Sequence, residues 1–442
     1  MQNNFARLLL SGTNSGCGKT TVFCAILKAL KLRGEDVAAF KCGPDFIDPM
    51  FHAAVIGAPS ANADSYFCGE WLSYVFAQSA HSVNLIEGAM GYYDGMGFTR
   101  EHSAWDVGRR LHAPAVLIVD GKGAALSVVA QMQGFARFCR DSGIRGFIIN
   151  RVTERTYSGI RSVWKDQSIR LYGYLPPLPE EYILKSRHLG LVTAGEVQDL
   201  QKKMQDLAML AEKTLDIDGL LQLARQAPAL EYREPALPAL APLKMAVARD
   251  AAFCFYYKEN FDLFRTLGAQ IEFFSPLSDE SVPQDADVLW FGGGYPELYA
   301  EQLEANESMR ASVRTAAEKG TPVFAECGGF LYLNKLLEGR KMAGVLDGSS
   351  ENKKRPVRFG YIGLEAKEDC LLANKGMKYR AHEFHYYDCT DNGNSFIASR
   401  KGSTYECMVA DQHLVAGFPH IHFYSNLEGA VTFYKNCLEN KK

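Results

Sequence analysis

The chain of 442 residues lacks a marked excess of charge, a long apolar run and an N-terminal targeting pattern. Its formal net charge of −3 gives no electrostatic reason to bind nucleic acid or an anionic membrane. No apolar run is long enough to span a bilayer, and Met1 to Arg7 do not open a signal peptide. We therefore expect a water-soluble protein with no nucleic acid and no membrane among its partners.

The eleven cysteines are scattered, from Cys17 to Cys437, and no two of them have the CxxC spacing. An odd number of cysteines without that spacing argues against a disulfide framework and against a zinc ribbon. We therefore expect a reducing, cytoplasmic location, with most of the thiols buried in the core.

What the sequence does contain is two series in which short apolar runs alternate with amphipathic stretches. The first includes "RLLLSG", "VAAFKC" and "AVLIVD", and the second begins at "KMAVARD". Strand and helix in alternation predict a parallel sheet covered by helices. A proline-rich stretch, residues 228–243, separates the two series and is typical of a semi-rigid linker. The sequence thus predicts an α/β protein with domains at 1–227 and 244–442.

The stretch "LLLSGTNSGCGKTTV", residues 8–22, predicts a phosphate-binding loop of unusual spacing. The standard loop has a glycine five residues before its last glycine, but here Thr13 stands there and the glycine is shifted to Gly12. The loop lies between a strand and a helix expected to begin at Thr20, where free N–H groups favour an anion. We expect Lys19 to reach the outer phosphates and Thr20 to hold Mg²⁺. The predicted nucleotide-binding residues are Gly12, Asn14, Ser15, Gly16, Gly18, Lys19, Thr20, Thr21 and, as an adenine-reading amide at a strand end, Asn150.

A nucleotide with Mg²⁺ also requires a carboxylate near the loop. "KCGPDFIDPMFH" places Asp45 and Asp48 just after one strand, and "NLIEGAMGYYDG" places Glu87 at the tip of another. A lone carboxylate after a strand is usually a helix cap or a solvated turn, so that alternative stays open. We predict Thr20, Glu87 and Asp45 as metal ligands, and Asp45 and Asp48 as substrate-binding residues.

In the second series, "TPVFAECGGFLYLNKLL" predicts a strand, a sharp turn and a helix, with Cys327 at the turn. Such an elbow presents a nucleophile above a sheet, and the helix start is expected to lower the pKa of the thiol. A cysteine nucleophile needs a base, and "AGFPHIHFYSN" supplies His420 and His422. We expect only one of these histidines to face Cys327. The alternative is a buried, inert thiol.

The motifs together resemble those of the cobyrinate a,c-diamide synthases over nearly the whole chain. "GTNSGCGKT", "KCGPDFIDPMFH", "IEGAMGYYDG", "ARDAAFCFYY", "FGGGYPELY", "FAECGGFLYL", "HEFHYY" and "HIHF" occur in the order of that family. The resemblance implies a dethiobiotin-synthetase-like P-loop ATPase fused to a class I, triad-type glutamine amidotransferase domain. It also implies ATP-dependent amidation of two acetate groups of cobyrinate in cobalamin biosynthesis, with glutamine or ammonia as nitrogen donor. The shifted glycine is then the family's own version of the phosphate loop.

Carried over by position, Cys327 is the nucleophile and His420 the base, while His422 stands where many amidotransferases have a glutamate. "FGGGYPE" resembles the glutaminase oxyanion loop, which favours Gly293 and Gly294 as donors. Arg380, in "RAHEFHYYD", is a candidate to grip a substrate carboxylate, with ordinary surface charge as the alternative.

Three other functions compete with this prediction. The same mechanism serves relatives that amidate Ni-sirohydrochlorin or hydrogenobyrinate. A non-catalytic partitioning ATPase of the MinD-like superfamily would carry a lysine where this chain has Asn14. A stand-alone glutaminase would not need the phosphate loop. Both a monomer and a homodimer are compatible with the sequence.

Overall fold

The computed structural model describes residues 1–57, 59–182, 186–187, 190–191 and 199–441. It forms two compact units, Met1–Pro235 and Ala236–Lys442. The division falls inside the proline-rich stretch 228–243. Strand β11 (Leu230–Glu231) pairs with β1 (Gln2–Asn3), so the first part of that stretch belongs to the N-terminal unit.

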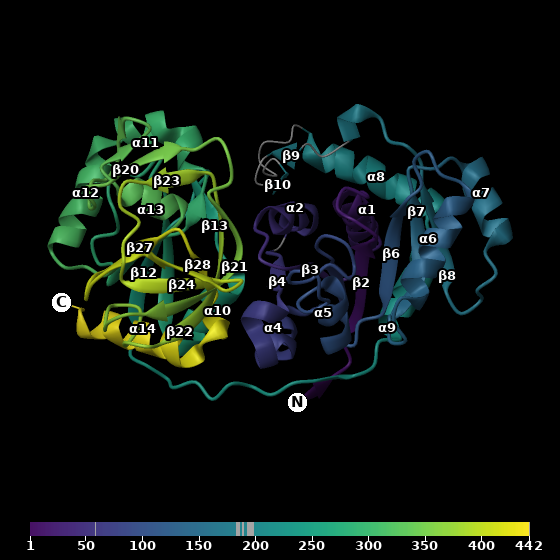
Figure 1. Ribbon diagram of the computed structural model, residues 1–442, viewed down its shortest axis with the longest axis horizontal. Coiled ribbons are helices and arrows are strands. Elements are labelled where there is room, and N and C mark those ends of the chain that lie inside the picture. Colours follow the sequence, from purple (N-terminus) through teal and green to yellow (C-terminus); the bar gives the residue numbers. More distant parts are fainter. Residues whose placement is uncertain (58, 183–185, 188–189, 192–198, 442) are drawn as a thin grey trace. The chain divides into compact units, whose positions relative to one another are not determined.

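The N-terminal unit is built on a parallel sheet of seven strands in the order β4-β3-β5-β2-β6-β7-β8 (Figure 1). The inner strands are apolar and buried on both faces, as the sequence predicted. The loops after β2, β3 and β5 leave the sheet at one edge, because the carboxyl ends of parallel strands lie together. The strands are β2 (Ala6–Gly12), β3 (Val37–Cys42), β4 (Ala61–Ala63), β5 (Val83–Glu87), β6 (Ala115–Asp120), β7 (Ile144–Asn150) and β8 (Arg170–Leu175), with a separate pair β9 (Ser186–Arg187) and β10 (Gly190–Leu191).

The helices of this unit confirm the predicted amphipathic stretches. Helix α1 follows the phosphate loop and packs along α8 (Figure 1). The stretch "EVQDLQKKMQDLAMLAEKTL", residues 196–215, also has a helical pattern in the sequence. Its residues 196–198 lie outside the described residues, and its described part forms α8. The α-helices are α1 (Lys19–Leu32), α2 (Ile47–Ile56), α3 (Ser65–Cys68), α4 (Leu72–Ser79), α5 (Ala104–Arg110), α6 (Leu126–Arg137), α7 (Glu154–Val163), α8 (Leu200–Thr214) and α9 (Ile217–Arg225).

The C-terminal unit has a central sheet in the order β14-β12-β15-β17-β27-β26, parallel except for the edge strand β26. A second, antiparallel sheet has the order β25-β24-β21-β22-β28. The strands of the central sheet are β12 (Leu243–Ala248), β14 (Ala269–Phe274), β15 (Val288–Phe291), β17 (Val323–Glu326), β26 (Val409–Ala410) and β27 (Leu414–Gly417). Those of the second sheet are β21 (Arg358–Ala366), β22 (Lys378–His385), β24 (Phe396–Arg400), β25 (Ser403–Cys407) and β28 (His420–Ile421).

Shorter elements and helices complete this unit. Strand β13 (Phe253–Phe255) pairs with β16 (Gly293–Gly294), and a small sheet joins β18 (Leu336–Leu337), β19 (Arg340–Lys341), β20 (Ser349–Asn352) and β23 (Tyr387–Cys389). The α-helices are α10 (Lys258–Leu267), α11 (Ala300–Ala305), α12 (Glu307–Glu318), α13 (Gly328–Leu333) and α14 (Leu427–Glu439). Among the helices that the structure describes in either unit, none is long and apolar enough to cross a membrane.

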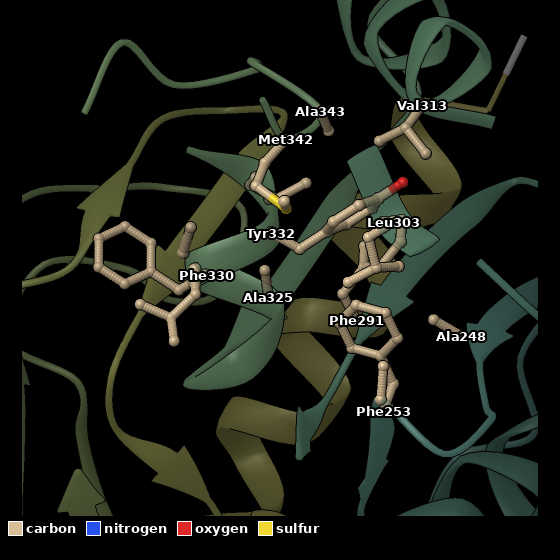
Figure 2. Packing of buried hydrophobic residues seen from close by; sticks show 14 of the residues in the cluster. Ala248, Phe253, Phe291, Leu303, Val313, Ala325, Phe330, Tyr332, Met342 and Ala343 are labelled. Carbon is tan, nitrogen blue, oxygen red and sulfur yellow. The ribbon is translucent and has the colours of Figure 1, made fainter. Parts of the chain in front are cut away.

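The core of the C-terminal unit closes around the short helix α13, all of whose residues are buried. Figure 2 shows two aromatic rings of this helix, Phe330 and Tyr332, pointing away from each other into the surrounding side chains. Phe253 and Phe291 both lie within stacking distance of Tyr332. Because interiors of this density resist displacement, the residue that precedes α13 is held firmly in place.

Candidate active sites

The phosphate loop joins β2 to α1, and its shifted glycine is required by close packing. A Cβ atom at Gly12 would lie 2.3 Å from Sγ of Cys17 and 2.9 Å from Cγ of Lys19. At the other end of the loop, Gly18 has φ 91° and leaves room for Asn150. With this spacing, the side chains of Cys17 and Lys19 pack against the backbone of Gly12, where no other residue would leave room for them.

The amide of Asn150 lies on this loop. Its Nδ2 donates to the carbonyl oxygen of Cys17 at 2.9 Å. The neighbouring Arg151, which sequence reasoning missed, donates to the carbonyl oxygen of Gly16 at 2.8 Å and is paired with Asp120 at 2.6 Å. The end of β7 thus supports the loop backbone, and the adenine-reading role of Asn150 stays a prediction.

The first residues of α1 meet two buried carboxylates. The Thr20 hydroxyl donates to Oε1 of Glu87 at 2.6 Å and lies 3.4 Å from Oδ2 of Asp48. Lys41, the penultimate residue of β3, places its Nζ 2.5 Å from Asp48 and 3.3 Å from Glu87. Nζ of Lys19 donates to the carbonyl oxygen of Asn14 at 3.1 Å, within the loop itself. The structure thus brings the predicted Thr20, Asp48 and Glu87 together and adds Lys41.

A buried histidine backs Glu87. His52 lies one helical turn after Asp48 on α2, so both side chains project from the same face. Its Nε2 is 2.7 Å from Oε2 of Glu87, and its Nδ1 is 3.2 Å from the Ser60 hydroxyl. His52 and Glu87 are both fully buried. The two oxygens of Glu87 are therefore held from opposite sides, by Thr20 and by His52.

Asp45 acts differently from Asp48. Its Oδ1 accepts the backbone N–H groups of Ile47 at 2.8 Å and Asp48 at 3.2 Å, so it caps the start of α2. Burial and the neighbouring Asp48 raise the pKa of Asp45 to about 6. The helix-cap alternative thus describes Asp45 in this structure, and its roles toward metal and substrate stay predictions.

Lys41, His52, Asp48 and Glu87 form a buried network in which positive and negative charges compensate one another. Burial acts to raise the pKa of Glu87, but Lys41 and the hydrogen bond with His52 lower it to about 2. Burial acts to lower the pKa of Lys41, but Asp48 and Glu87 raise it above its ordinary value. Burial lowers the pKa of Lys19. Glu87 and Lys41 are therefore charged at neutral pH, which suits a site for a metal-bound polyphosphate.

The oxygen atoms at this edge fit a hard divalent cation. The Thr20 hydroxyl and the Glu87 carboxylate converge within 2.6 Å of each other. Within the part of the chain that the structure describes, no three His, Cys, Asp or Glu side chains are grouped to hold a metal by themselves. Mg²⁺ commonly takes one or two protein oxygens and completes its shell with phosphate and water. The residues present fit that pattern.

Cys327 lies at a sharp turn between β17 and α13. Its backbone has φ 49° and ψ −103°, and its N–H donates to the carbonyl oxygen of Gly417 at 2.7 Å. The side chain is only 8% exposed. Burial, with a further contribution from Glu297, raises the pKa of the Cys327 thiol and outweighs the lowering by the N–H of Gly328 at the helix start, so the overall shift is opposite to the predicted one. The elbow predicted from the sequence is present, and burial favours the neutral form of the Cys327 thiol.

The predicted oxyanion loop lies beside this elbow. A Cβ atom at Gly328, next to Cys327, would lie 3.0 Å from the backbone nitrogen of Gly294. The N–H of Gly329 donates to the carbonyl oxygen of Gly292 at 2.8 Å, and the N–H of Gly292 donates to Tyr256 at 2.8 Å. Those two N–H groups are already bonded, while the predicted oxyanion donors Gly293 and Gly294 lie beside the elbow, and their role stays a prediction.

The two predicted histidines contact different neighbours. A Cβ atom at Gly293 would lie 2.4 Å from Cε1 of His420, so that ring packs against the glycine loop. Nε2 of His422 lies 4.0 Å from Oε2 of Glu259, and its ring is 5.0 Å from that of Tyr257. Burial lowers the pKa of His420 and of His422 to about 3 each. The contact with Gly293 favours His420 as the histidine nearer the elbow.

Arg380 lies on β22 with an exposed side chain. Its backbone N–H donates to the Ser425 hydroxyl at 3.0 Å. The backbone of Arg380 thus helps to fix the segment after β28, while its proposed contact with substrate stays a prediction.

Comparison with known proteins agrees with this division into two sites. Residues 8–191 match the CobQ/CobB/MinD/ParA nucleotide binding domain, and residues 244–427 match the CobB/CobQ-like glutamine amidotransferase domain. A protein of Listeria monocytogenes serotype 4b (strain F2365) named cobyrinate a,c-diamide synthase is 38% identical, over 95% of this chain and 97% of that protein. The chain belongs to the cobyrinate a,c-diamide synthase family.

Other members of the family match over a similar length. The protein of that name from Caldanaerobacter subterraneus subsp. tengcongensis is 38% identical over 97% of this chain and 98% of its own length. The one from Thermoplasma volcanium is 36% identical over 99% of this chain and 98% of its own length. The family and the two-domain α/β fold predicted from the sequence are thereby confirmed.

Besides Arg151, two further residues of the nucleotide site, Lys41 and His52, were not predicted from the sequence. Lys41 is a lysine in a strand whose residues are all buried, and that position was a usable signal. His52 shares a helix face with Asp48, so its spacing was also a signal. Neither pattern predicts that the side chain contacts Glu87, because Glu87 lies in a strand more than thirty residues further along the chain.

Proposed function

We propose that this protein amidates the a and c acetate carboxylates of cobyrinate in cobalamin biosynthesis. ATP is the phosphoryl donor, and glutamine or ammonia is the nitrogen donor. The observation that carries the proposal is the presence, in one chain, of two chemically different centres. One is a phosphate loop beside the Lys41–Glu87 network, and the other is a cysteine elbow beside a glycine loop and a buried histidine.

The N-terminal unit is proposed to activate the carboxylate. Transfer of the γ-phosphoryl group of ATP to a carboxylate oxygen forms an acyl phosphate and releases ADP. Ammonia then attacks the carbonyl carbon, the bond to the phosphate oxygen breaks, and inorganic phosphate leaves. Lys19 and Lys41 would neutralise charge on the transferred group. When bound, Mg²⁺ would be held by Thr20 and Glu87 and would neutralise phosphate charge.

The loop after β5 supports the proposal of a macrocyclic substrate. It exposes two large apolar side chains, Met90, three residues after Glu87, and Phe98, further along the same loop. Exposed apolar groups beside a charged site suit a ligand that combines carboxylates with an apolar ring face.

The C-terminal unit is proposed to release ammonia from glutamine. The Cys327 thiol transfers its proton to His420 while sulfur attacks the side-chain amide carbon. The carbon–nitrogen bond breaks, His420 returns the proton, and ammonia leaves a thioester on Cys327. Water then cleaves the thioester and releases glutamate. The N–H groups of Gly293 and Gly294 would stabilise the oxyanion in both steps.

The test is mass spectrometry of the products formed by purified protein with ATP, Mg²⁺ and glutamine. Cobyrinate, hydrogenobyrinate and Ni-sirohydrochlorin are offered in parallel. Two amides on cobyrinate are expected. Two amides on the nickel ring alone would keep the mechanism and replace the substrate. Glutamine hydrolysis without amide on any ring would contradict the proposed substrate class.

A further inference from the structure

One motif singled out in the sequence, "ARDAAFCFYY", has no role in the chemistry described so far. The motif covers residues 248–257, and its second half is part of the segment Phe253–Asn260, which we call the brace. The brace begins as β13 and ends in the first turn of α10. It contacts both the glycine loop and the segment that carries the two histidines.

The first half of the brace holds the glycine loop. Phe253 and Phe255 pair with Gly294 and Gly293 across the two short strands β13 and β16. The hydroxyl of Tyr256 accepts the N–H of Gly292 at 2.8 Å and donates to the carbonyl oxygen of Ala248. The position of the loop beside the cysteine elbow therefore depends on the brace.

The second half of the brace holds the histidine segment. Nδ2 of Asn260 donates to the carbonyl oxygen of Ile421 at 2.8 Å, and Oδ1 of Asn260 accepts the N–H of Phe423 at 2.9 Å. Asn260 is 1% exposed, so these bonds lie in the interior. A single side chain thus binds the backbone on both sides of His422.

A second buried side chain completes this arrangement from the central sheet. Oε1 of Glu326, the residue just before Cys327, accepts the N–H of Ile421 at 2.7 Å, and Glu326 is 3% exposed. The N–H and the carbonyl of Ile421 are therefore both bound by side chains. Since Ile421 directly follows His420, its backbone position sets where the His420 ring lies.

We propose that Asn260 and Glu326 are positioning residues for the glutaminase reaction, because they fix the backbone that carries His420 beside the cysteine elbow. The proposal rests on the proposed function, since it assumes that Cys327 and His420 release ammonia from glutamine. Neither residue takes part in the chemistry. Each holds His420 at the correct distance and orientation from Cys327, because a small displacement of a catalytic group causes a large loss in rate.

The first experiment compares Asn260→Ala with Asn306→Ala. Asn306 is a matched control in the same unit, because its Nδ2 also donates to two backbone carbonyls, at 3.0 and 2.9 Å, and its Oδ1 caps α12. In Asn260→Ala, kcat for glutamine hydrolysis should fall by about 30-fold with KM for glutamine changed less than threefold. Amidation driven by free ammonia should be unchanged. Asn306→Ala should keep both activities.

The second experiment compares Glu326→Gln with Glu326→Ala. The glutamine amide keeps an oxygen that can accept the Ile421 N–H, whereas alanine removes it. Glu326→Gln should therefore keep kcat for glutamine hydrolysis within threefold of the parent, and Glu326→Ala should lower it by about tenfold or more. A merely structural role would not produce this rescue together with intact ammonia-driven turnover.

The outcomes separate this proposal from the one on which it rests. If the parent protein hydrolyses no glutamine, the proposed function fails. If the parent is active and Asn260→Ala keeps its kcat, or loses glutamine- and ammonia-driven turnover equally, the positioning proposal is wrong. If Asn260→Ala does not fold, the comparison of Glu326→Gln with Glu326→Ala tests the proposal instead. Equal kcat for glutamine hydrolysis in these two variants would overturn it.

Discussion

The two candidate sites handle buried ionisable groups in opposite ways. Around the phosphate loop, Lys41, Asp48 and Glu87 lie within ion-pair distance, so buried charges of opposite sign compensate one another. Around the elbow, burial raises the pKa of Cys327 and lowers that of His420 to about 3, so both groups are neutral. The first site thus contains charges that compensate one another, whereas in the second site burial favours the neutral forms of Cys327 and His420.

This difference follows from the ligands that each site is proposed to take. A polyphosphate and a divalent cation are charged throughout, and fixed charges that are already oriented require little reorganisation when they bind. A thiol in a neutral pocket is a weak nucleophile, so the proton transfer that activates it depends on a well-placed base. The C-terminal site is therefore expected to be sensitive to geometry, and the N-terminal site to charge.

The sharpest separation of the two sites is expected from Cys327→Ser. Without the thiolate, glutamine-dependent amidation should fall by at least about 10³-fold, because the thioester cannot form. Amidation with free ammonia should continue at the parental rate, because the phosphate loop is untouched. Steady-state assays with each nitrogen donor measure both. Equal loss with ammonia would show that the proposed division of labour is wrong.

Lys41→Met probes the charged site. Removing the ammonium leaves Asp48 and Glu87 as buried carboxylates without their cation, which costs about 3–5 kcal/mol in the unfolding of the N-terminal unit. Amidation should fall by about 10²-fold with either nitrogen donor, while glutamine hydrolysis is retained. Lys28→Met is the control, since Lys28 donates to Gln201 in an exposed position away from Asp48 and Glu87. If Lys41→Met kept the parental rate of amidation, the proposed role of Lys41 in neutralising phosphate charge would be wrong.

The two units should also differ in their response to acid. The folded pKa values of His382, His420 and His422, about 3 each, lie below the ordinary value of 6.5. The unfolded chain therefore binds more protons than the folded one below pH 6.5, and stability falls as pH decreases, by about 1 kcal/mol per pH unit and histidine. In the N-terminal unit burial lowers the pKa of one histidine, His52, which acts in the same direction, and Glu87, with a folded pKa of about 2, contributes stability that is lost only as pH falls from 4.5 to 2.

Urea unfolding at pH 6.5 and 5.0 measures this, followed by the fluorescence of Trp290, the sole tryptophan of the C-terminal unit. The other three tryptophans are replaced by phenylalanine. His422→Asn should reduce the pH dependence, and His413→Asn, at an exposed position, should not. Burial raises the pKa of Glu326 to about 8, so this group binds more protons in the folded state and opposes part of the loss caused by the histidines. A pH dependence that is the same in His422→Asn as in the parent would contradict the neutral state of His422.

Gly293→Ala tests the geometric sensitivity of the elbow and should have the smallest effect. The new Cβ would lie 2.4 Å from Cε1 of His420, so the ring must shift. Glutamine hydrolysis should fall by about tenfold, and ammonia-driven amidation should stay intact. Gly363→Ala is the control, because its Cβ would meet only the Ser399 hydroxyl, at 2.9 Å. Unchanged hydrolysis in Gly293→Ala would place the working base elsewhere.

Local sequence patterns predicted those parts of each site whose residues are close together in the sequence. The phosphate loop and the Cys327 elbow are both strand–turn–helix units, and each was visible from an apolar run followed by glycines. The sign of the pKa shift at Cys327 was not predictable, because it depends on how deeply the whole unit buries the thiol. Asn260 was also invisible, because its partners lie more than 160 residues away in the sequence.

The left-handed backbone at Cys327 bears on how this protein would evolve. A non-glycine residue at φ 49° stores strain of about 1–3 kcal/mol, and glycine would release it. The nucleophile thus lies where its own replacement would make the fold more stable. In a lineage supplied with free ammonia, mutation of Cys327 to glycine would release this strain and be unopposed by selection for glutamine hydrolysis, so we expect glutaminase activity to be lost before amidation.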